Sequence, residues 1–325
     1  MTTIRCKICN TEHLQKLYTV KEMMLGMNDT FNYFQCVQCE CLQIVKIPFN
    51  IEKYYPENYY SLKYSPEIHF KGEIKQTLKK IRDSYIITGK GFTGRIIQLF
   101  YPNLSIELYN FRKVKLKKKD KILDVGSGSG IIPYIFFNAG FVKTIGIDPY
   151  ISNDITYENG LTIKKIDFLD LNVSDFDVIM YNHSFEHLSN PIEHLQQVYR
   201  SLKALGKLII RIPTVSSFAW NKYGVNWVQL DAPRHIFLYS IKSLVILADQ
   251  TNFKIDEINY ESTYFQFAGS EQYLKGIALH DQNSYYKGNS SLFSEKEIKQ
   301  FKRDAILLNK RKEGDSIFII LSKKN

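Results

Sequence analysis

The stretch Ile122-Leu-Asp-Val-Gly-Ser-Gly-Ser-Gly130 decides the fold class of this chain. Its first four residues are typical of a buried strand, and three glycines at alternate positions follow at once. Residues 131–139 then have the apolar pattern of a helix that ends near Gly140. Glycines at a strand-to-helix turn let backbone N–H groups approach a ligand closely. The sequence therefore predicts a ligand-binding loop between a strand and a helix.

Strand and helix patterns alternate along the chain from residue 121 onward. Further strands are expected at residues 144–147, 161–166, 176–181 and 208–212, and a helix is expected to begin after Asn190 and end at Gly206. This alternation predicts an α/β fold, a doubly wound parallel sheet with helices on both faces. Ligands of such sheets bind outside the carboxyl ends of the strands.

Acidic residues stand at the ends of the first two predicted strands. Asp124 lies two residues before the first glycine, and the G-x-G-x-G spacing of the glycines differs from the G-x-G-x-x-G of nicotinamide enzymes. Asp148 ends the next strand, 22 residues beyond Gly126, where a carboxylate can accept hydrogen bonds from both ribose hydroxyls of a cofactor. A turn residue before Pro149 is the alternative role for Asp148.

Two later strand ends extend the predicted cofactor site. Asp167 is placed to hold an adenine amino group, with Phe168 or Leu169 beside the base, although a local cap is the rival role for this acid. Asn182 follows the fourth strand. The complete predicted set comprises Asp124, Gly126, Gly128, Gly130, Asp148, Asp167, Phe168 and Asn182.

All five cysteines lie within the first 41 residues. Cys6 and Cys9 form one Cys-x-x-Cys pair and Cys36 and Cys39 form another, with 26 residues between the pairs. Two such pairs supply a tetrahedral thiolate site that suits structural Zn²⁺ and leaves no position open for catalysis. Reduced cysteines without a metal are the alternative. Cys41 is a spare thiol that could replace Cys39.

Several segments after the glycine loop carry a family resemblance. Phe176-Asp-Val-Ile179, Phe185-Glu-His-Leu188 and Asn190-Pro191 occur in order, followed by Leu202-Lys203 and Gly206. In this order they resemble class I S-adenosylmethionine-dependent methyltransferases. The resemblance implies S-adenosylmethionine as cofactor and a Rossmann-like seven-stranded sheet, whose last two strands would be residues 253–259 and 316–321. Ala204-Leu205 departs from the usual Pro-Gly turn.

Segments on both sides of these motifs resemble a narrower group within the family. The cysteine module with its following tyrosines, and the stretch Trp227 to Ile236, resemble bacterial methyltransferases of sugar and surface-polysaccharide biosynthesis. The implied acceptor is a sugar, nucleotide sugar or glycan group, with or without a phosphate, methylated on oxygen or carbon. We expect a zinc-binding module at 1–50, an aromatic and helical linker or acceptor-side segment at 51–115, and a methyltransferase domain at 116–325 with an acceptor lid at about 213–240.

Histidines are the candidate bases for methylation of a hydroxyl or an activated carbon, because their pKa lies near neutral pH. His235 is favoured as the base and His183 is second. Asp231, Arg234 and Tyr59 are candidate substrate contacts, with Arg234 as a clamp for phosphate or carboxylate. The alternative is that Asp231, Arg234 and His235 form a structural network that fixes the lid.

The composition of the chain limits the kinds of partner and the cellular location that we expect. The net charge of +10 is compatible with an anionic acceptor or with a solvated lysine-rich surface. The sequence has no apolar run of membrane-spanning length and no apolar N-terminal signal segment, so a cytoplasmic location is expected. A ribose-methylating RNA enzyme and a non-catalytic zinc and S-adenosylmethionine-binding protein are the rival functions. Nucleic acid is disfavoured, because residues after the fourth strand lack an Asn/Asp-Pro-Pro-aromatic motif.

Overall fold

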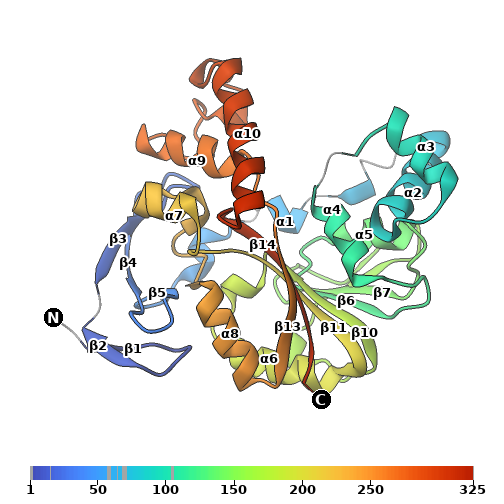
Figure 1. The fold of residues 1–325 in the computed structure, drawn as a ribbon, viewed down its shortest axis with the longest axis horizontal. Coiled ribbons are helices and arrows are strands. Elements are labelled where there is room, and N and C mark those ends of the chain that lie inside the picture. Colours follow the sequence, from blue (N-terminus) through green and yellow to red (C-terminus); the bar gives the residue numbers. More distant parts are fainter. Residues whose placement is uncertain are drawn as a thin grey trace.

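A mostly parallel sheet of eight strands forms the centre of the molecule (Figure 1). The computed structural model describes residues 3–14, 16–56, 60–63, 65–67, 72–103 and 106–324. From one edge to the other, the strands are β13 (Phe253–Tyr260), β14 (Ser316–Lys323), β11 (Leu202–Pro213), β10 (Phe176–Asn182), β6 (Ile122–Val125), β7 (Thr144–Ile147), β9 (Thr162–Lys164) and β8 (Ile155–Thr156). The predicted α/β class is therefore confirmed.

Helices cover both faces of this sheet, because successive strand residues point to opposite sides. Val178 and Met180 of β10 pack in one apolar cluster with residues of α2 (Glu73–Thr88) and α5 (Ile131–Asn138). The alternate residues Ile179 and Tyr181 pack in another cluster with residues of α6 (Pro191–Ser201) and α8 (Ile241–Gln250). The doubly wound arrangement predicted from the alternation of strands and helices is confirmed.

Seven strands of the sheet correspond to the predicted ones, including the final antiparallel hairpin of β13 and β14. The eighth is the two-residue edge strand β8, which pairs antiparallel with β9. The predicted end of α6 near Gly206 is wrong. The helix ends at Ser201 because Leu202 pairs with Phe176 and begins β11.

The N-terminal part contributes strands to two small antiparallel sheets beside the central sheet. β1 (Thr3–Arg5) pairs with β2 (Glu12–Leu14), and a second sheet has the order β12-β5-β4-β3. Its strands are β3 (Leu17–Lys21), β4 (Thr30–Gln35), β5 (Leu42–Ile44) and β12 (Phe237–Leu238). Because β12 comes from the predicted lid, the N-terminal module and the lid share one sheet.

The remaining elements surround these two sheets. The helices are α1 (Tyr60–Lys63), α3 (Phe92–Phe100), α4 (Ile106–Asn110), α7 (Phe218–Tyr223), α9 (Phe265–Leu274) and α10 (Glu295–Arg311). The 3₁₀ turns are η1 (Ile51–Tyr54), η3 (Phe111–Val114), η4 (Phe168–Asp170), η5 (Phe185–His187), η6 (Gly224–Asn226), η7 (Val228–Leu230), η8 (Tyr285–Lys287) and η9 (Ser290–Leu292). No helix among the described residues is long and apolar enough to cross a bilayer.

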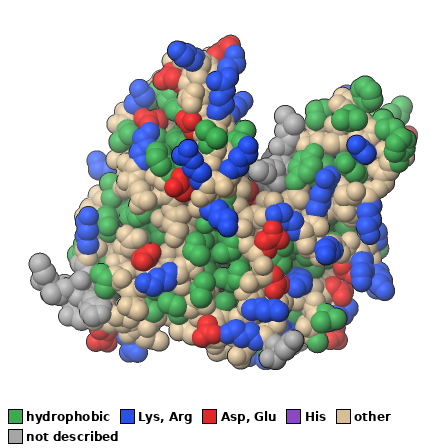
Figure 2. Space-filling model, in the orientation of Figure 1, with side chains coloured by type: hydrophobic (Ala, Val, Ile, Leu, Met, Phe, Trp, Pro, Cys, Tyr) green, Lys and Arg blue, Asp and Glu red, His purple; other side chains and the backbone are tan. Residues whose placement is uncertain are grey.

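The visible surface is mixed in character. Figure 2 shows Lys and Arg side chains spread over several elements of one face, with acidic side chains among them. Hydrophobic side chains gather over the α2 and α3 region, where Phe92, Leu99 and Phe100 are exposed. On this face, the positive charge is therefore not gathered into a single basic stripe.

Candidate functional site

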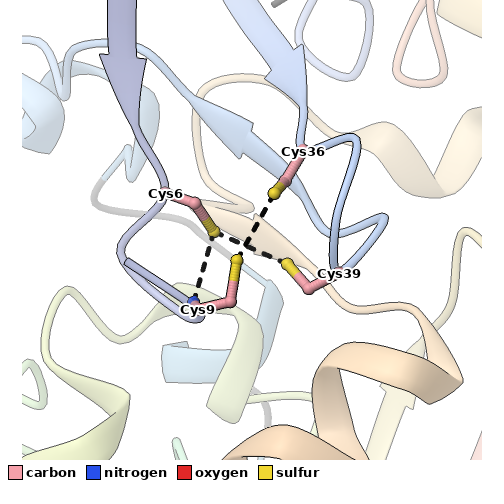
Figure 3. Close-up of side chains that lie close together, drawn as sticks. All are labelled: Cys6, Cys9, Cys36 and Cys39. Atoms are coloured by element: carbon pink, nitrogen blue, oxygen red, sulfur yellow. Dashed lines mark hydrogen bonds between the residues drawn. The ribbon is translucent and has the colours of Figure 1, made fainter. Parts of the chain in front are cut away.

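Four cysteine thiols converge in the N-terminal module. Figure 3 shows the sulfur atoms of Cys6, Cys9, Cys36 and Cys39 pointing toward one common centre. The Sγ atoms of Cys6 and Cys39 are 3.5 Å apart, as are those of Cys9 and Cys36. Zn–S bonds of about 2.3 Å in a tetrahedron place sulfurs about 3.8 Å apart, so the four thiols fit a zinc ion closely.

Two tight turns of the same kind present these thiols. The N–H of Asn10 donates to the carbonyl of Cys6 at 3.0 Å, and the N–H of Glu40 donates to the carbonyl of Cys36 at 2.8 Å. Asn10 and Glu40 both have positive φ, of 59° and 63°. The left-handed conformation suits asparagine and is less common for glutamate. Cys41 is buried outside the cluster, with its Sγ 3.7 Å from a backbone carbonyl.

The glycine loop lies between the carboxyl ends of β6 and β7. The N–H of Gly128 donates to Asp148 Oδ2 at 2.8 Å, which ties the loop to the end of β7. Gly128 has a φ of +55°, and a Cβ at this position would overlap the carbonyl oxygen of Ser61 in α1. A Cβ at Gly126 would lie 2.5 Å from the Cβ of Ser184. Glycine is thus required where α1 and the segment after β10 approach the loop.

Asp124 and Asn182, which end neighbouring strands, are in direct contact. Asn182 Nδ2 donates to Asp124 Oδ1 at 2.8 Å, and Arg211 Nη1 lies 3.4 Å from Asn182 Oδ1. Arg211 Nε in turn donates to the buried carboxylate of Glu261 at 2.7 Å. Burial raises the pKa of Asp124 to about 7, against the opposing effects of Asn182 and Arg211. The end of β6 therefore presents a carboxyl group that is poised to ionise.

Asp148 and Asp167 make local hydrogen bonds. Asp148 Oδ1 accepts from the N–H of Tyr150 at 2.8 Å, and burial raises the pKa of Asp148 against this bond and that of Gly128. Asp167 Oδ1 accepts from the N–H of Leu169 at 2.8 Å, which is the local cap that the sequence left as its rival role. Both carboxylates are thus oriented by the backbone of the strand ends.

Phe168 does not lie open to a ligand. Its side chain is 1% exposed and packs beside the rings of Tyr181 and His194. The ring of Phe168 is buried because it packs in the main apolar cluster of the molecule. Of the two predicted neighbours of an adenine base, Leu169 in η4 is the one that is partly exposed.

Three histidines surround one buried glutamate beyond the end of β10. Glu186 Oε1 lies 3.5 Å from His183 Nδ1 and 3.8 Å from His235 Nε2. The rings of His187 and His235 are 4.8 Å apart between centroids. Burial would raise the pKa of Glu186, yet the neighbouring histidines hold it below its usual value. The structure therefore brings both predicted bases together around Glu186, which was not predicted as a site residue.

The two candidate bases differ in access to solvent. The side chain of His183 is 39% exposed, whereas that of His235 is 8% exposed. Burial, together with the neighbouring His187, lowers the pKa of His235 to about 4. Of these two candidate bases, His183 is therefore the more accessible to an incoming acceptor.

Arg234 has the structural role that the sequence analysis left open. Its side chain is fully buried and bonds to Glu22 at 2.8 Å and to Asp231 at 2.5 Å. Nη1 also donates to the carbonyl of Tyr54 at 3.2 Å. With its guanidinium held in this network, Arg234 is not exposed to clamp a substrate phosphate, and Asp231 is engaged as its partner. Tyr59 lies outside the described residues.

Two aromatic residues also lie near this site: Tyr150, which sequence reasoning missed, and Tyr55, which it noted only as part of an aromatic stretch on the acceptor side. Tyr150 follows Asp148 and Pro149 and is 81% exposed, and its ring is nearly parallel to that of Tyr55 at 6.3 Å. Tyr55 Oη lies 3.2 Å from His187 Nδ1. The signal for Tyr150 was its place two residues after the predicted ribose-binding acid, Asp148. Tyr55 could not be placed, since its partners come from distant segments.

Part of the chain matches known proteins. Residues 98–258 match the family described as a methyltransferase domain. A tRNA U34 carboxymethyltransferase of Dichelobacter nodosus is 26% identical over 144 residues, 42% of this chain and 46% of the relative. A malonyl-[acyl-carrier protein] O-methyltransferase of Calditerrivibrio nitroreducens is 31% identical over 124 residues, 37% of this chain and 44% of the relative. The matches span less than half of either relative.

Solved structures give weaker likenesses. An S-adenosylmethionine-dependent methyltransferase from Archaeoglobus fulgidus is 19% identical with a TM-score of 0.41, covering 72% of this chain and 100% of that one. The O-methyltransferase of a Brevibacillus brevis polyketide synthase, in complex with S-adenosyl-L-homocysteine, is 15% identical with a TM-score of 0.40, covering 87% and 82%. The similarity to the methyltransferase-domain family thus rests on residues 98–258, just under half of the chain.

Proposed function

We propose that this chain transfers the methyl group of S-adenosylmethionine to a small-molecule acceptor, a sugar, nucleotide sugar or glycan group. One observation carries the proposal. The glycine loop with Asp124 and Asp148 lies at the same sheet edge as the segment from Asn182 to His187, whose Ser184 approaches Gly126. A donor site and a set of proton-accepting side chains are therefore adjacent.

The donor fits the residues of this edge. Asp124 and Asp148 offer carboxylate oxygens, and the buried Ser129 Oγ of the loop has no hydrogen-bond partner among the described residues. Asp148 would hold the ribose hydroxyls and Asp124 would face the positive charge of the donor, while Leu169 and Asp167 would border the adenine. S-adenosylmethionine supplies an already activated sulfonium methyl group, so the chain mainly aligns the acceptor and excludes water.

His183 is the better-placed base for the acceptor. It follows β10 directly, and its partly exposed ring faces the carboxylate of Glu186. A base at this position can take the proton of an acceptor hydroxyl as the oxygen attacks the methyl carbon. The deeper position of His235 makes it second, which reverses the order favoured from sequence.

The cysteine cluster is proposed to hold structural zinc. Its four sulfurs fit a closed tetrahedral site, which leaves no position for a substrate. The module then serves to hold the lid segment through the pairing of β5 with β12. Its presence, together with the stretch from Trp227 to Ile236, supports a sugar or glycan acceptor through the resemblance to polysaccharide-biosynthesis enzymes.

Donor binding and turnover test the proposal separately. Calorimetry with S-adenosylmethionine should show one site per chain, and donor-dependent methylation should occur with members of a nucleotide-sugar panel. His183→Ala should lower turnover at least about 100-fold, the usual contribution of a general base, and leave donor affinity within about twofold. His280→Ala removes an exposed histidine outside the site and should leave turnover unchanged. Absence of donor binding would contradict the proposal.

An RNA acceptor is the second candidate. The net charge of +10 and the likeness to a tRNA-modifying enzyme favour it. The other curated relative is named for a malonyl-carrier protein, so the relatives do not agree on an acceptor. RNA binding that falls steeply between about 50 and 200 mM salt, accompanied by methyl transfer to RNA, would support this candidate over a sugar.

A further inference from the structure

The carboxylate of Glu186 is buried without a hydrogen-bond donor. Its side chain is fully buried, and neither oxygen accepts a hydrogen bond from any residue that the structure describes. The nearest nitrogen, His183 Nδ1, is 3.5 Å away, which is longer than an ordinary hydrogen bond. A buried carboxylate left without a donor or cation is strongly unfavourable. Glu186 therefore requires a partner beyond these side chains.

The two neighbouring imidazoles present further acceptors. His235 Nδ1 lies 2.7 Å from the carbonyl of Gln229, and His187 Nδ1 lies 2.8 Å from the carbonyl of Arg234. A carbonyl oxygen can only accept, so Nδ1 carries the proton in both rings. In a neutral ring, Nε2 then has a free lone pair. Histidines that bind metals commonly donate their other N–H to a backbone carbonyl in this way.

We propose that Glu186, His187 and His235 bind a divalent transition-metal cation. A ligand atom of each residue lies within 4.8 Å of those of the other two. His235 Nε2 and Glu186 Oε1 are 3.8 Å apart, close to the roughly 3.4 Å between ligands on one tetrahedral zinc ion. The remaining ligand atoms lie within 4.8 Å and come together on one ion by side-chain rotation. Two imidazoles with one carboxylate suit zinc, iron, manganese or cobalt, and three protein ligands leave a position open.

The position of this site suggests its chemistry, which rests on the proposed function. η5 carries Glu186 and His187 directly after Ser184, which contacts the glycine loop. A cation there can bind the acceptor oxygen and lower the pKa of its hydroxyl. The hydroxyl proton passes to His183, the oxygen bonds to the methyl carbon, and the electrons of the broken carbon–sulfur bond stay on sulfur. The metal is neither oxidised nor reduced.

Metal content distinguishes this site from the cysteine cluster. The purified chain, stripped of metal and reloaded with Co²⁺, should bind two ions, one with thiolate-to-cobalt charge-transfer absorption and one without. Glu186→Gln keeps the shape of the side chain and should weaken the second ion at least about tenfold while the thiolate absorption remains. Glu193→Gln makes the same change at an exposed position of α6 and should keep both ions.

The outcomes separate this inference from the proposed function. A single ion with only thiolate absorption, or a second ion that Glu186→Gln does not weaken, overturns the metal site whether or not S-adenosylmethionine binds. In that case, ordered water or the acceptor itself satisfies Glu186. A second ion lost in Glu186→Gln supports the site even if calorimetry finds no donor binding.

Discussion

At the scale of single residues, the ionisation of Asp124 would make binding at the proposed donor site depend on pH. Burial raises the pKa of its carboxyl group to about 7 in the protein without donor, so below this pH the group is mostly protonated and neutral. A positively charged donor favours the ionised form, and its binding then requires release of a proton. We predict that the affinity for S-adenosylmethionine falls as the pH is lowered from about 7.5 to 5.5, approaching tenfold per pH unit below the pKa.

Calorimetry in buffers of different ionisation enthalpy measures this proton release directly. Asp124→Asn keeps the size of the side chain and its position beside Asn182, and it should bind the donor more weakly with a smaller slope against pH. Some slope should remain because burial also raises the pKa of Asp148. The same slope in wild type and variant would exclude Asp124 as the group that ionises.

Side-chain burial limited what the sequence could say about individual residues. Asp124 and Asp148 could be singled out because each ends a strand, and strand ends of a parallel sheet share one edge. Phe168 and Arg234 were proposed as ligand contacts, but their burial depends on partners distant in sequence, such as Glu22 for Arg234. The sequence did not single out Glu186, because its carboxylate comes to lie among histidines without a hydrogen-bond donor only when separate loops pack together.

At the scale of elements, the two Cys-x-x-Cys turns are proposed to be held together by one metal ion bound to all four thiolates. Cys36→Ser removes one of the four proposed zinc ligands. We predict a zinc affinity at least about 100-fold lower, because losing a ligand weakens metal binding more than losing a residue that only hydrogen-bonds to a ligand. The melting temperature should fall as well, since zinc binding contributes to folding. Thiolate-to-cobalt absorption and thermal unfolding measure the two effects.

Cys41→Ala is the matched control, since this thiol is buried beside the cluster but outside it. It should keep the thiolate absorption and lose only the stability expected for a small cavity. If Cys41→Ala abolished the absorption while Cys36→Ser kept it, the ligand set would have to be reassigned.

Elements that follow a local pattern were predictable, whereas elements defined by a partner were not. β6 and β7 occupy the predicted residues because each is a short apolar run bounded by turn residues. β8 and β12 have two residues each, too few for any periodicity, and exist because β9 and β5 offer free edges. Leu202, which was predicted to be helical, likewise lies in β11 because it pairs with Phe176 of β10.

At the scale of the whole molecule, the N-terminal module and the lid form one unit. Tyr33 Oη donates to the carbonyl of His235 at 2.8 Å, and Ser240 Oγ donates to the carbonyl of Cys39 at 2.5 Å. Pairing of β5 with β12 adds backbone hydrogen bonds between the same parts. These contacts hold the backbone of His235 against the N-terminal module. They therefore connect the cysteine cluster to the proposed acceptor site, although the two are far apart in the sequence.

Glu22 and Arg234 are the strongest test of this unit. Both side chains are fully buried, and Glu22 also accepts from the backbone N–H groups of Leu25 and Met27. Glu22→Gln removes this carboxylate but leaves Arg234 paired with Asp231, so the expected loss is that of one buried charge-assisted hydrogen bond, about 1.5–3 kcal/mol. We predict that Glu22→Gln lowers the free energy of unfolding by about this amount in urea denaturation, whereas Glu12→Gln, at an exposed position of β2, leaves the midpoint unchanged. Combining Glu22→Gln with Arg234→Met should cost less than the sum of the single changes, because both changes remove the same contact between Glu22 and Arg234. Equal midpoints for wild type and Glu22→Gln would mean that the module is held to the lid by the paired strands and their apolar contacts alone.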